Sequence, residues 1–190
     1  MNKTRLEAFS DGVIAILITI MVLELRIPEG ADWNAMQPII PIFTTYVLSF
    51  VVLGIYWTNH HHLIHAADRI TGAILWANLH LLFWLSLIPF GTGWMGRNHF
   101  APLTAALYGC VLLMAAIAYT ILERTIIAAQ GPQSRLKQAL GNDVKGYASL
   151  AMYAVAIPLA FVNRWLAFAL YVGVVMMWLI PDRRIERRLS

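Results

Sequence analysis

The amino-acid sequence predicts an all-α polytopic membrane protein with six transmembrane helices in one domain, residues 1–190. Its composition supports this class, because 59% of the residues are hydrophobic and only 13% are charged, against about 25% charged residues in soluble domains. Six apolar segments are each long enough for a helix of about 20 residues to cross the hydrocarbon core. The basic residues are also unequally divided between the connecting segments, as in multi-span membrane proteins.

The first predicted span is 6–27. It follows a capping-box pattern in which Thr4 and Glu7 are expected to satisfy the first turn of the helix. Phe9-Ser10-Asp11-Gly12 comes next, and then a dense apolar run from Val13 to Leu23. We expect a transmembrane helix and not a cleaved signal peptide, because acidic residues interrupt the basic start and no small-residue cleavage site follows.

Turn-forming residues separate the other five spans. Pro28-Glu29-Gly30 precedes the second span, and Gly91-Thr92-Gly93 together with Gly96-Arg97-Asn98 is expected to end the third. The longest polar loop begins with Gln130–Ser134, and Val162-Asn163-Arg164 joins the last two spans. The fifth span is the shortest and contains Pro158, so we expect it either to be kinked or to tilt little. These signals place the remaining spans at 39–62, 70–94, 101–128, 145–162 and 164–181.

The positive-inside rule orients the spans. The amino terminus, the second–third loop, the fourth–fifth loop and the tail carry eleven of the 14 Lys and Arg residues, which are Lys3, Arg5, Arg69, Arg124, Arg135, Lys137, Lys145, Arg183, Arg184, Arg187 and Arg188. Only Arg26, Arg97 and Arg164 fall on the opposite side. We therefore expect both termini to be cytoplasmic, which an even number of spans requires. The basic tail is expected to contact anionic lipids of the bilayer.

The first span presents one stripe of residues along a single helical face. With Ile16 as the reference at 100° per residue, Gly12, Thr19, Ile20, Leu23 and Ile27 are among the positions within about 60° of it. Asp11 lies about 140° away, on the other face, where a carboxylate near the membrane needs a partner or water. A stripe of this kind could also contact lipid or a neighbouring helix, and Asp11 could have a purely structural role.

A short motif opens the same span. Arg5, Phe9, Ser10 and Asp11 follow the pattern Arg-x-x-x-Phe-Ser-Asp, which resembles the signature of the lysosomal and endosomal potassium-channel family, transmembrane protein 175. One copy of the motif in a six-span chain is similar to the bacterial branch of this family. The resemblance implies a homotetramer in the inner or plasma membrane of a bacterium, with the first helix of each subunit lining the pore.

The resemblance also implies which residues line that pore. The family's hydrophobic constriction lies seven positions after the motif phenylalanine, which corresponds to Ile16. Further lining positions correspond to Thr19 or Ile20, one turn on, and to Leu23. The stripe contains the same four residues, although their periodicity alone does not distinguish a pore from a lipid contact.

These observations predict a potassium-permeable, modestly selective cation channel. The carbonyl filter Thr-Val-Gly-Tyr-Gly is absent, so an apolar ring is expected to select ions by penalising the more strongly hydrated sodium. The alternative is a proton-coupled secondary transporter of small cations, in which Asp11 and the histidines carry protons. No nucleophile triad, phosphate loop or nucleotide fingerprint indicates an enzyme. We expect no cofactor besides the permeant potassium ion, and no nucleic-acid partner.

Four histidines lie near the cytoplasmic end of the second span: His60, His61, His62 and His65. His61 and Trp57, one helical turn apart, are expected to hold Asp11 and Arg5 in a polar network between subunits, which the resemblance supports. A metal site on His61 and His65 is one alternative, and solvated interfacial histidines are another. The roles of the other three histidines stay open.

Two polar residues lie within the third span. Asn78 and His80 are expected to hydrogen-bond across helices, because a polar side chain at membrane depth needs a partner.

Overall fold

The computed structural model describes residues 2–131, 134, 136–137 and 143–179, and these residues form helices and turns without any strand. The described elements are α1 (Lys3–Val22), α2 (Trp33–Met36), the 3-10 turn η1 (Gln37–Ile39), α3 (Ile40–His65), α4 (Gly72–Ser86), α5 (Ile88–Arg97), α6 (Pro102–Gln130), α8 (Val144–Val162) and α9 (Arg164–Leu179). The predicted all-α class is therefore confirmed.

These elements form six long helical stretches within the described part of the chain. Four stretches are long and apolar enough to cross a membrane, and they are Trp33–His65, Gly72–Arg97, Pro102–Gln130 and Val144–Val162. α1 has 20 residues, or about 30 Å at 1.5 Å per residue, and α9 has 16. The last two residues of the sixth predicted span, the tail arginines and Arg135 lie outside the described residues.

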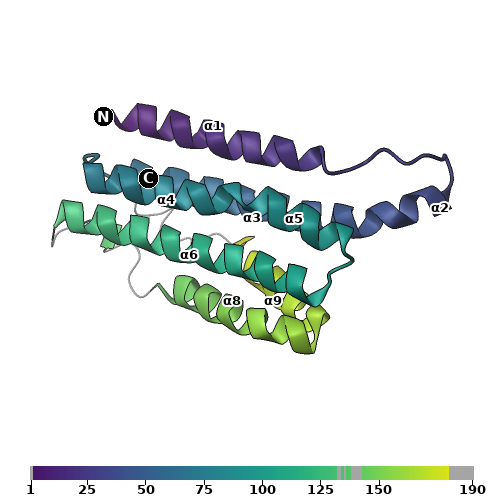
Figure 1. Cartoon of the computed structure of the whole chain (residues 1–190). Coiled ribbons are helices and arrows are strands. Elements are labelled where there is room, and N and C mark those ends of the chain that lie inside the picture. The colour runs from purple at the N-terminus through teal and green to yellow at the C-terminus, as the bar shows by residue number, and fades with distance from the viewer. Residues whose placement is uncertain (1, 132–133, 135, 138–142, 180–190) are drawn as a thin grey trace.

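The helices pack as an elongated bundle with α1 along one side (Figure 1). α1 contacts α3, α4 and α5, whereas α6 packs against α4 and α8, and α8 packs against α9. α8 and α9 lie on the side of the bundle away from α1 (Figure 1). α1 is therefore a peripheral helix within one subunit, and one of its faces is free of the subunit's own core.

The first span begins and ends differently from the prediction. The capping box at Thr4 is wrong, because Asn2 is the N-cap and its side chain accepts a hydrogen bond from the Thr4 backbone N–H at 3.2 Å. A residue already inside the helix cannot cap it. α1 also ends at Val22 and not at residue 27, since Leu23 is its C-cap and a turn follows.

The third predicted span consists of two helices. α4 ends at Ser86 and α5 begins at Ile88 with Pro89 in its first turn, a position that proline tolerates because its missing N–H is not needed there. Gly91-Thr92-Gly93 lies inside α5 and does not end the helix, contrary to the prediction. Small residues there allow close helix packing, since a Cβ at Gly91 would lie 3.2 Å from a ring carbon of Tyr108.

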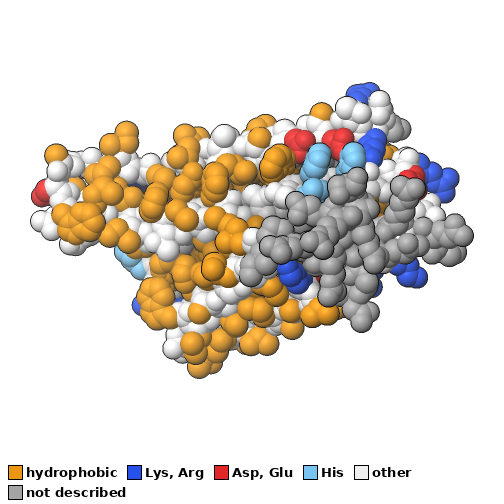
Figure 2. Space-filling model, turned by 180° about the vertical axis from the view of Figure 1, so that it is seen from behind, with side chains coloured by type: hydrophobic (Ala, Val, Ile, Leu, Met, Phe, Trp, Pro, Cys, Tyr) orange, Lys and Arg blue, Asp and Glu red, His pale blue; other side chains and the backbone are white. Residues whose placement is uncertain are grey.

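The surface distribution of side chains agrees with a membrane protein. Figure 2 shows hydrophobic side chains spread over the length of one face, while most of the visible Lys, Arg, Asp, Glu and His side chains gather toward one end. This end contains the start of α1 and the end of α3. The Lys3 ammonium of α1 donates a hydrogen bond to the His65 carbonyl oxygen of α3. An apolar belt with charges at its ends is the pattern that a bilayer requires.

Candidate functional site

α1 has two faces with different environments. Its buried residues are Leu6, Ser10, Ile14, Leu17 and Met21, which recur at the spacing of one helical face. They pack against the bundle formed by α3, α4 and α5. The predicted stripe lies on the remaining face.

The stripe residues point away from their own subunit. Ile16 is 57% exposed, Ile20 is 45% exposed and Leu23 is 78% exposed. Thr19 is also exposed, and its hydroxyl donates to the Ile16 carbonyl oxygen at 2.9 Å, which leaves the hydroxyl oxygen facing outward. A row of large apolar side chains without internal partners is expected to contact lipid, another protein chain or the wall of a pore.

The motif carboxylate has a partner on α3. The Trp57 indole Nε1–H donates a hydrogen bond to Asp11 Oδ1 at 3.0 Å. Because α1 and α3 run antiparallel, this contact lies about two helical turns from the Lys3–His65 contact. The structure therefore brings together Asp11 and Trp57, but within one chain, whereas the sequence analysis expected their network to lie between subunits.

Other members of the predicted network are not joined within one subunit. Arg5 and His61 are exposed, and neither side chain has a hydrogen bond to another described residue. The His61 ring stacks on the His65 ring with centroids 6.0 Å apart. Phe9 is half exposed. These three motif and network residues, Arg5, Phe9 and His61, are available to a neighbouring chain.

A buried hydrogen-bond chain connects the motif serine to α3 and α4. The Ser10 hydroxyl donates to the Leu6 carbonyl oxygen at 2.9 Å and accepts from Asn78 Nδ2 at 3.0 Å. Asn78 Oδ1 lies 2.6 Å from His60 Nε2. An amide oxygen can only accept, so the network assigns the proton to His60 Nε2. Three helices are thus joined directly behind the exposed stripe.

Sequence reasoning chose His61 and missed His60, which is 1% exposed and carries the buried contact. The prediction for Asn78 is confirmed, because it bonds across helices. The prediction for His80 is wrong, since Trp84 of its own helix donates to His80 Nε2 at 3.0 Å. The signal in the sequence that could have identified His60 is the pair of polar residues Ser10 and Asn78 within apolar spans. Buried polar side chains need hydrogen-bond partners, and His60 is the third polar residue that meets this need.

A metal centre finds no support among the described residues. They contain no group of three or more His, Cys, Asp or Glu side chains that could hold a metal ion. His61 and His65 face each other as stacked rings and have no carboxylate beside them as a third ligand. Among the described residues, the geometry offers a polar support for α1 and not a coordination site.

Comparison with known proteins identifies the family. The family model described as "Endosomal/lysosomal potassium channel TMEM175" matches residues 5–89. A potassium channel of Chryseobacterium sp. (strain P1-3) is 54% identical over 190 residues, covering 100% of this chain and 99% of the relative. The chain belongs to the TMEM175 family.

Two further relatives show the breadth of the TMEM175 family. The crystal structure of a lysosomal potassium-selective channel TMEM175 homolog from Chamaesiphon minutus matches with a TM-score of 0.78 at 24% identity, covering 94% of this chain and 96% of that one. This likeness establishes the fold. The human endosomal/lysosomal proton channel TMEM175 is 28% identical over 192 residues, which cover 92% of this chain but 38% of the human protein.

Proposed function

We propose that the protein is a potassium-permeable cation channel formed by four copies of the chain. The observation that carries this proposal is the exposed stripe Ile16, Ile20 and Leu23 on a helix whose opposite face is fixed to its own subunit. Four such stripes can meet on a common axis without rearranging any subunit core. The bacterial relative with 54% identity is named a potassium channel, which supports the choice of ion.

The stripe gives the pore a hydrophobic constriction. Ile16 is the narrowest position, Thr19 or Ile20 lies one turn further on, and Leu23 ends the row. A ring of branched apolar side chains cannot replace an ion's hydration shell, so conduction depends on how easily water is held or shed there. Potassium, which is less strongly hydrated than sodium, passes more easily. This mechanism predicts modest selectivity for potassium over sodium.

The buried chain of Ser10, Asn78 and His60, and the Trp57–Asp11 bond, hold the far side of α1. We assign them the role of fixing the rotation of α1, so that the stripe faces the pore axis. The exposed side chains of Arg5, Phe9 and His61 are assigned to contacts between subunits. Both termini are placed in the cytoplasm of a bacterial cell.

The test is reconstitution of the purified protein into liposomes loaded with potassium. A channel passes net potassium current down any gradient, and a second gradient of protons is not required. Strict exchange of potassium for protons would instead indicate the proton-coupled transporter. A third set of liposomes has a proton gradient and contains no potassium, and its proton flux is measured because the human relative is named as a proton channel. Proton flux without potassium flux would refute the proposal.

A further inference from the structure

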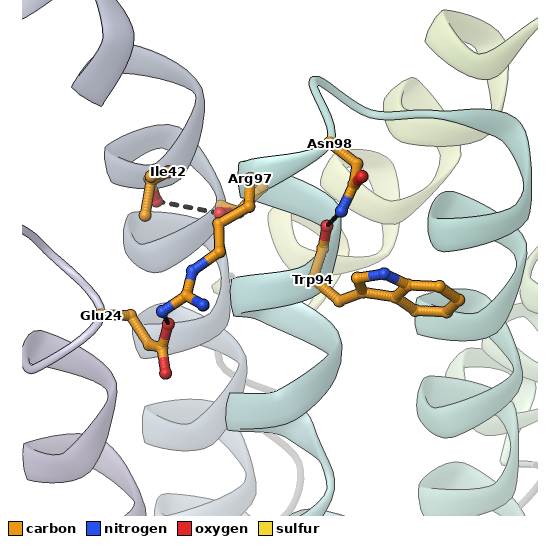
Figure 3. Close-up of polar contacts among 6 residues, drawn as sticks. Glu24, Ile42, Trp94, Arg97 and Asn98 are labelled. Atoms are coloured by element: carbon orange, nitrogen blue, oxygen red, sulfur yellow. Dashed lines mark hydrogen bonds and ion pairs between the residues drawn. The ribbon is translucent and has the colours of Figure 1, made fainter.

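The carboxyl end of α1 is tied to α5 by an ion pair. Glu24 lies in the turn after α1, and its Oε2 accepts from the Arg97 guanidinium in the last turn of α5 (Figure 3). The two residues are 73 positions apart in the sequence. Leu23, the last of the predicted pore-lining residues, directly precedes Glu24; Ile27, also assigned to the stripe, lies beyond the end of α1. The contact therefore lies immediately beside Leu23.

The Glu24 carboxylate lies directly against α5. A Cβ at Gly93 would lie 2.9 Å from Glu24 Oε2, a separation that real Cβ contacts do not show. Glycine at this position is what allows the carboxylate to reach Arg97 along the helix surface. The Glu24 carboxylate therefore lies against the backbone of α5 while it pairs with Arg97.

The end of α5 is itself fixed to α3. A Cβ at Gly96 would lie 2.6 Å from Thr45 Oγ1 and 2.8 Å from Ile42 Cα. Thr45 Oγ1 in turn donates to the Ile42 carbonyl oxygen at 2.9 Å, and Ile42 lies near the ion pair in Figure 3. A small residue lets the two helix backbones approach closely. Arg97 therefore extends from a helix end that is packed against α3.

We propose that Arg97 is a positioning residue that holds the carboxyl end of α1, and with it Leu23, at a fixed distance from the pore axis. The inference rests on the proposed function. Leu23 is 78% exposed and has little packing of its own to hold it. Partly exposed ion pairs add little to folding stability, so the contribution of this pair lies in the position of the helix end.

The charge of Arg97 has a second consequence at the same place. It directs the Glu24 carboxylate toward α5 and away from the stripe. Without Arg97, four carboxylates would be released next to the end of the pore, where negative charge attracts sodium and potassium alike. Loss of Arg97 therefore widens the range of Leu23 positions and lowers the discrimination between the two ions.

The experiment compares the wild type with Arg97→Gln, Arg97→Lys and the double reversal Glu24→Arg with Arg97→Glu. The first readout is the potassium-to-sodium permeability ratio of reconstituted protein. We expect Arg97→Gln to lower the ratio about threefold, a change within reach of one ion pair. Arg97→Lys and the double reversal are expected to restore the wild-type permeability ratio, because in both variants residues 24 and 97 carry opposite charges.

A matched control removes another arginine assigned to the same side of the membrane. Arg164 lies over the ring of Trp165, 5.4 Å from its centroid, and has no carboxylate partner among the described residues. Arg164→Gln changes the surface charge by the same amount and is expected to leave the ratio unchanged. An equal change in both glutamine variants would show a general surface-charge effect and would overturn the proposal.

The second readout is independent of conduction. Spin labels at Val22→Cys and Phe43→Cys, both on exposed side chains, report the distance from the end of α1 to α3 within one subunit diluted among unlabelled ones. Cys110 is exposed and is first replaced by alanine. We expect a narrow distance distribution in the wild type and after either restoration, and a broad one in Arg97→Gln.

The two readouts separate the inference from the function on which it rests. A wild type that passes no potassium would refute the proposed function, while the distances would still test the contact. A narrow distribution in Arg97→Gln would overturn the inference even in a conducting protein. A broad distribution with an unchanged permeability ratio would also overturn it, because the helix end would then not affect selectivity.

Discussion

Replacement of Ile16 by asparagine tests the constriction directly. Complete burial of an isoleucine side chain is favourable by about 1.5–3 kcal/mol. Ile16 is 57% exposed in one subunit, so hydration of this exposed surface costs about 1 kcal/mol. Four copies of the side chain therefore oppose wetting of the constriction by on the order of 4 kcal/mol. Asparagine removes most of this opposition because its amide binds water.

The expected result is a large gain of flux with a loss of selectivity. A barrier lower by about 1.4 kcal/mol increases a rate tenfold, so relief of even part of the opposition raises potassium flux by about tenfold or more. Sodium flux is expected to rise further, since a wetted ring no longer penalises the more strongly hydrated ion. Ion flux from liposomes, with potassium and sodium compared in parallel, measures both effects.

The matched control is Val155→Asn. Val155 is an aliphatic residue of α8 that is 56% exposed, and α8 lies on the side of the bundle away from α1 (Figure 1). This variant carries the same kind of change to a surface assigned to lipid, and its flux is expected to equal that of the wild type. If Ile16→Asn behaves like Val155→Asn, with unchanged conductance and selectivity, the stripe does not line a pore.

Three further predictions concern the support of α1 and the helix packing. Asn78→Ala leaves His60 and Ser10 without their shared partner and is expected to lower the free energy of unfolding by about 1–3 kcal/mol, measured by thermal unfolding in detergent against the exposed-site control His62→Ala. Trp57→Phe removes the indole donor to Asp11 and is expected to reduce the yield of intact tetramer in size-exclusion chromatography; an unchanged oligomer would show that the bond does not support assembly. Gly96→Val forces α5 away from Thr45 and is expected to prevent folding, whereas Gly54→Val, where a Cβ meets no atom within 4 Å, is tolerated; equal expression of the two would contradict the packing argument.

The sequence was sufficient to predict the all-α membrane class and to group the stripe residues on one face of α1. A bilayer requires long apolar helices with basic residues at one side, and both features can be read directly from composition and order. The stripe on α1 follows from helical geometry alone, since residues such as Ile16 and Ile20 share a face at any position of the helix in space. The structure then placed that face outward.

The helix limits were harder to predict, because several patterns allow more than one local structure. Leu23 to Ile27 continues the apolar run, yet α1 ends at Val22, where Glu24 can turn toward Arg97. The glycines of α5 look like a turn in the sequence. Inside the bundle they allow contact between helices, as at Gly96, and the packing outweighs their weak helix propensity.

Only the tertiary structure decided which polar residues contact one another. Four histidines lie within one and a half turns of α3, and the rotation of α3 against α1 and α4 decided that His60, not His61, meets Asn78. Glu24 and Arg97 likewise meet across 73 positions of sequence. Periodicity fixes which residues share a helix face, but only the packing of that helix against its neighbours decides what the face touches.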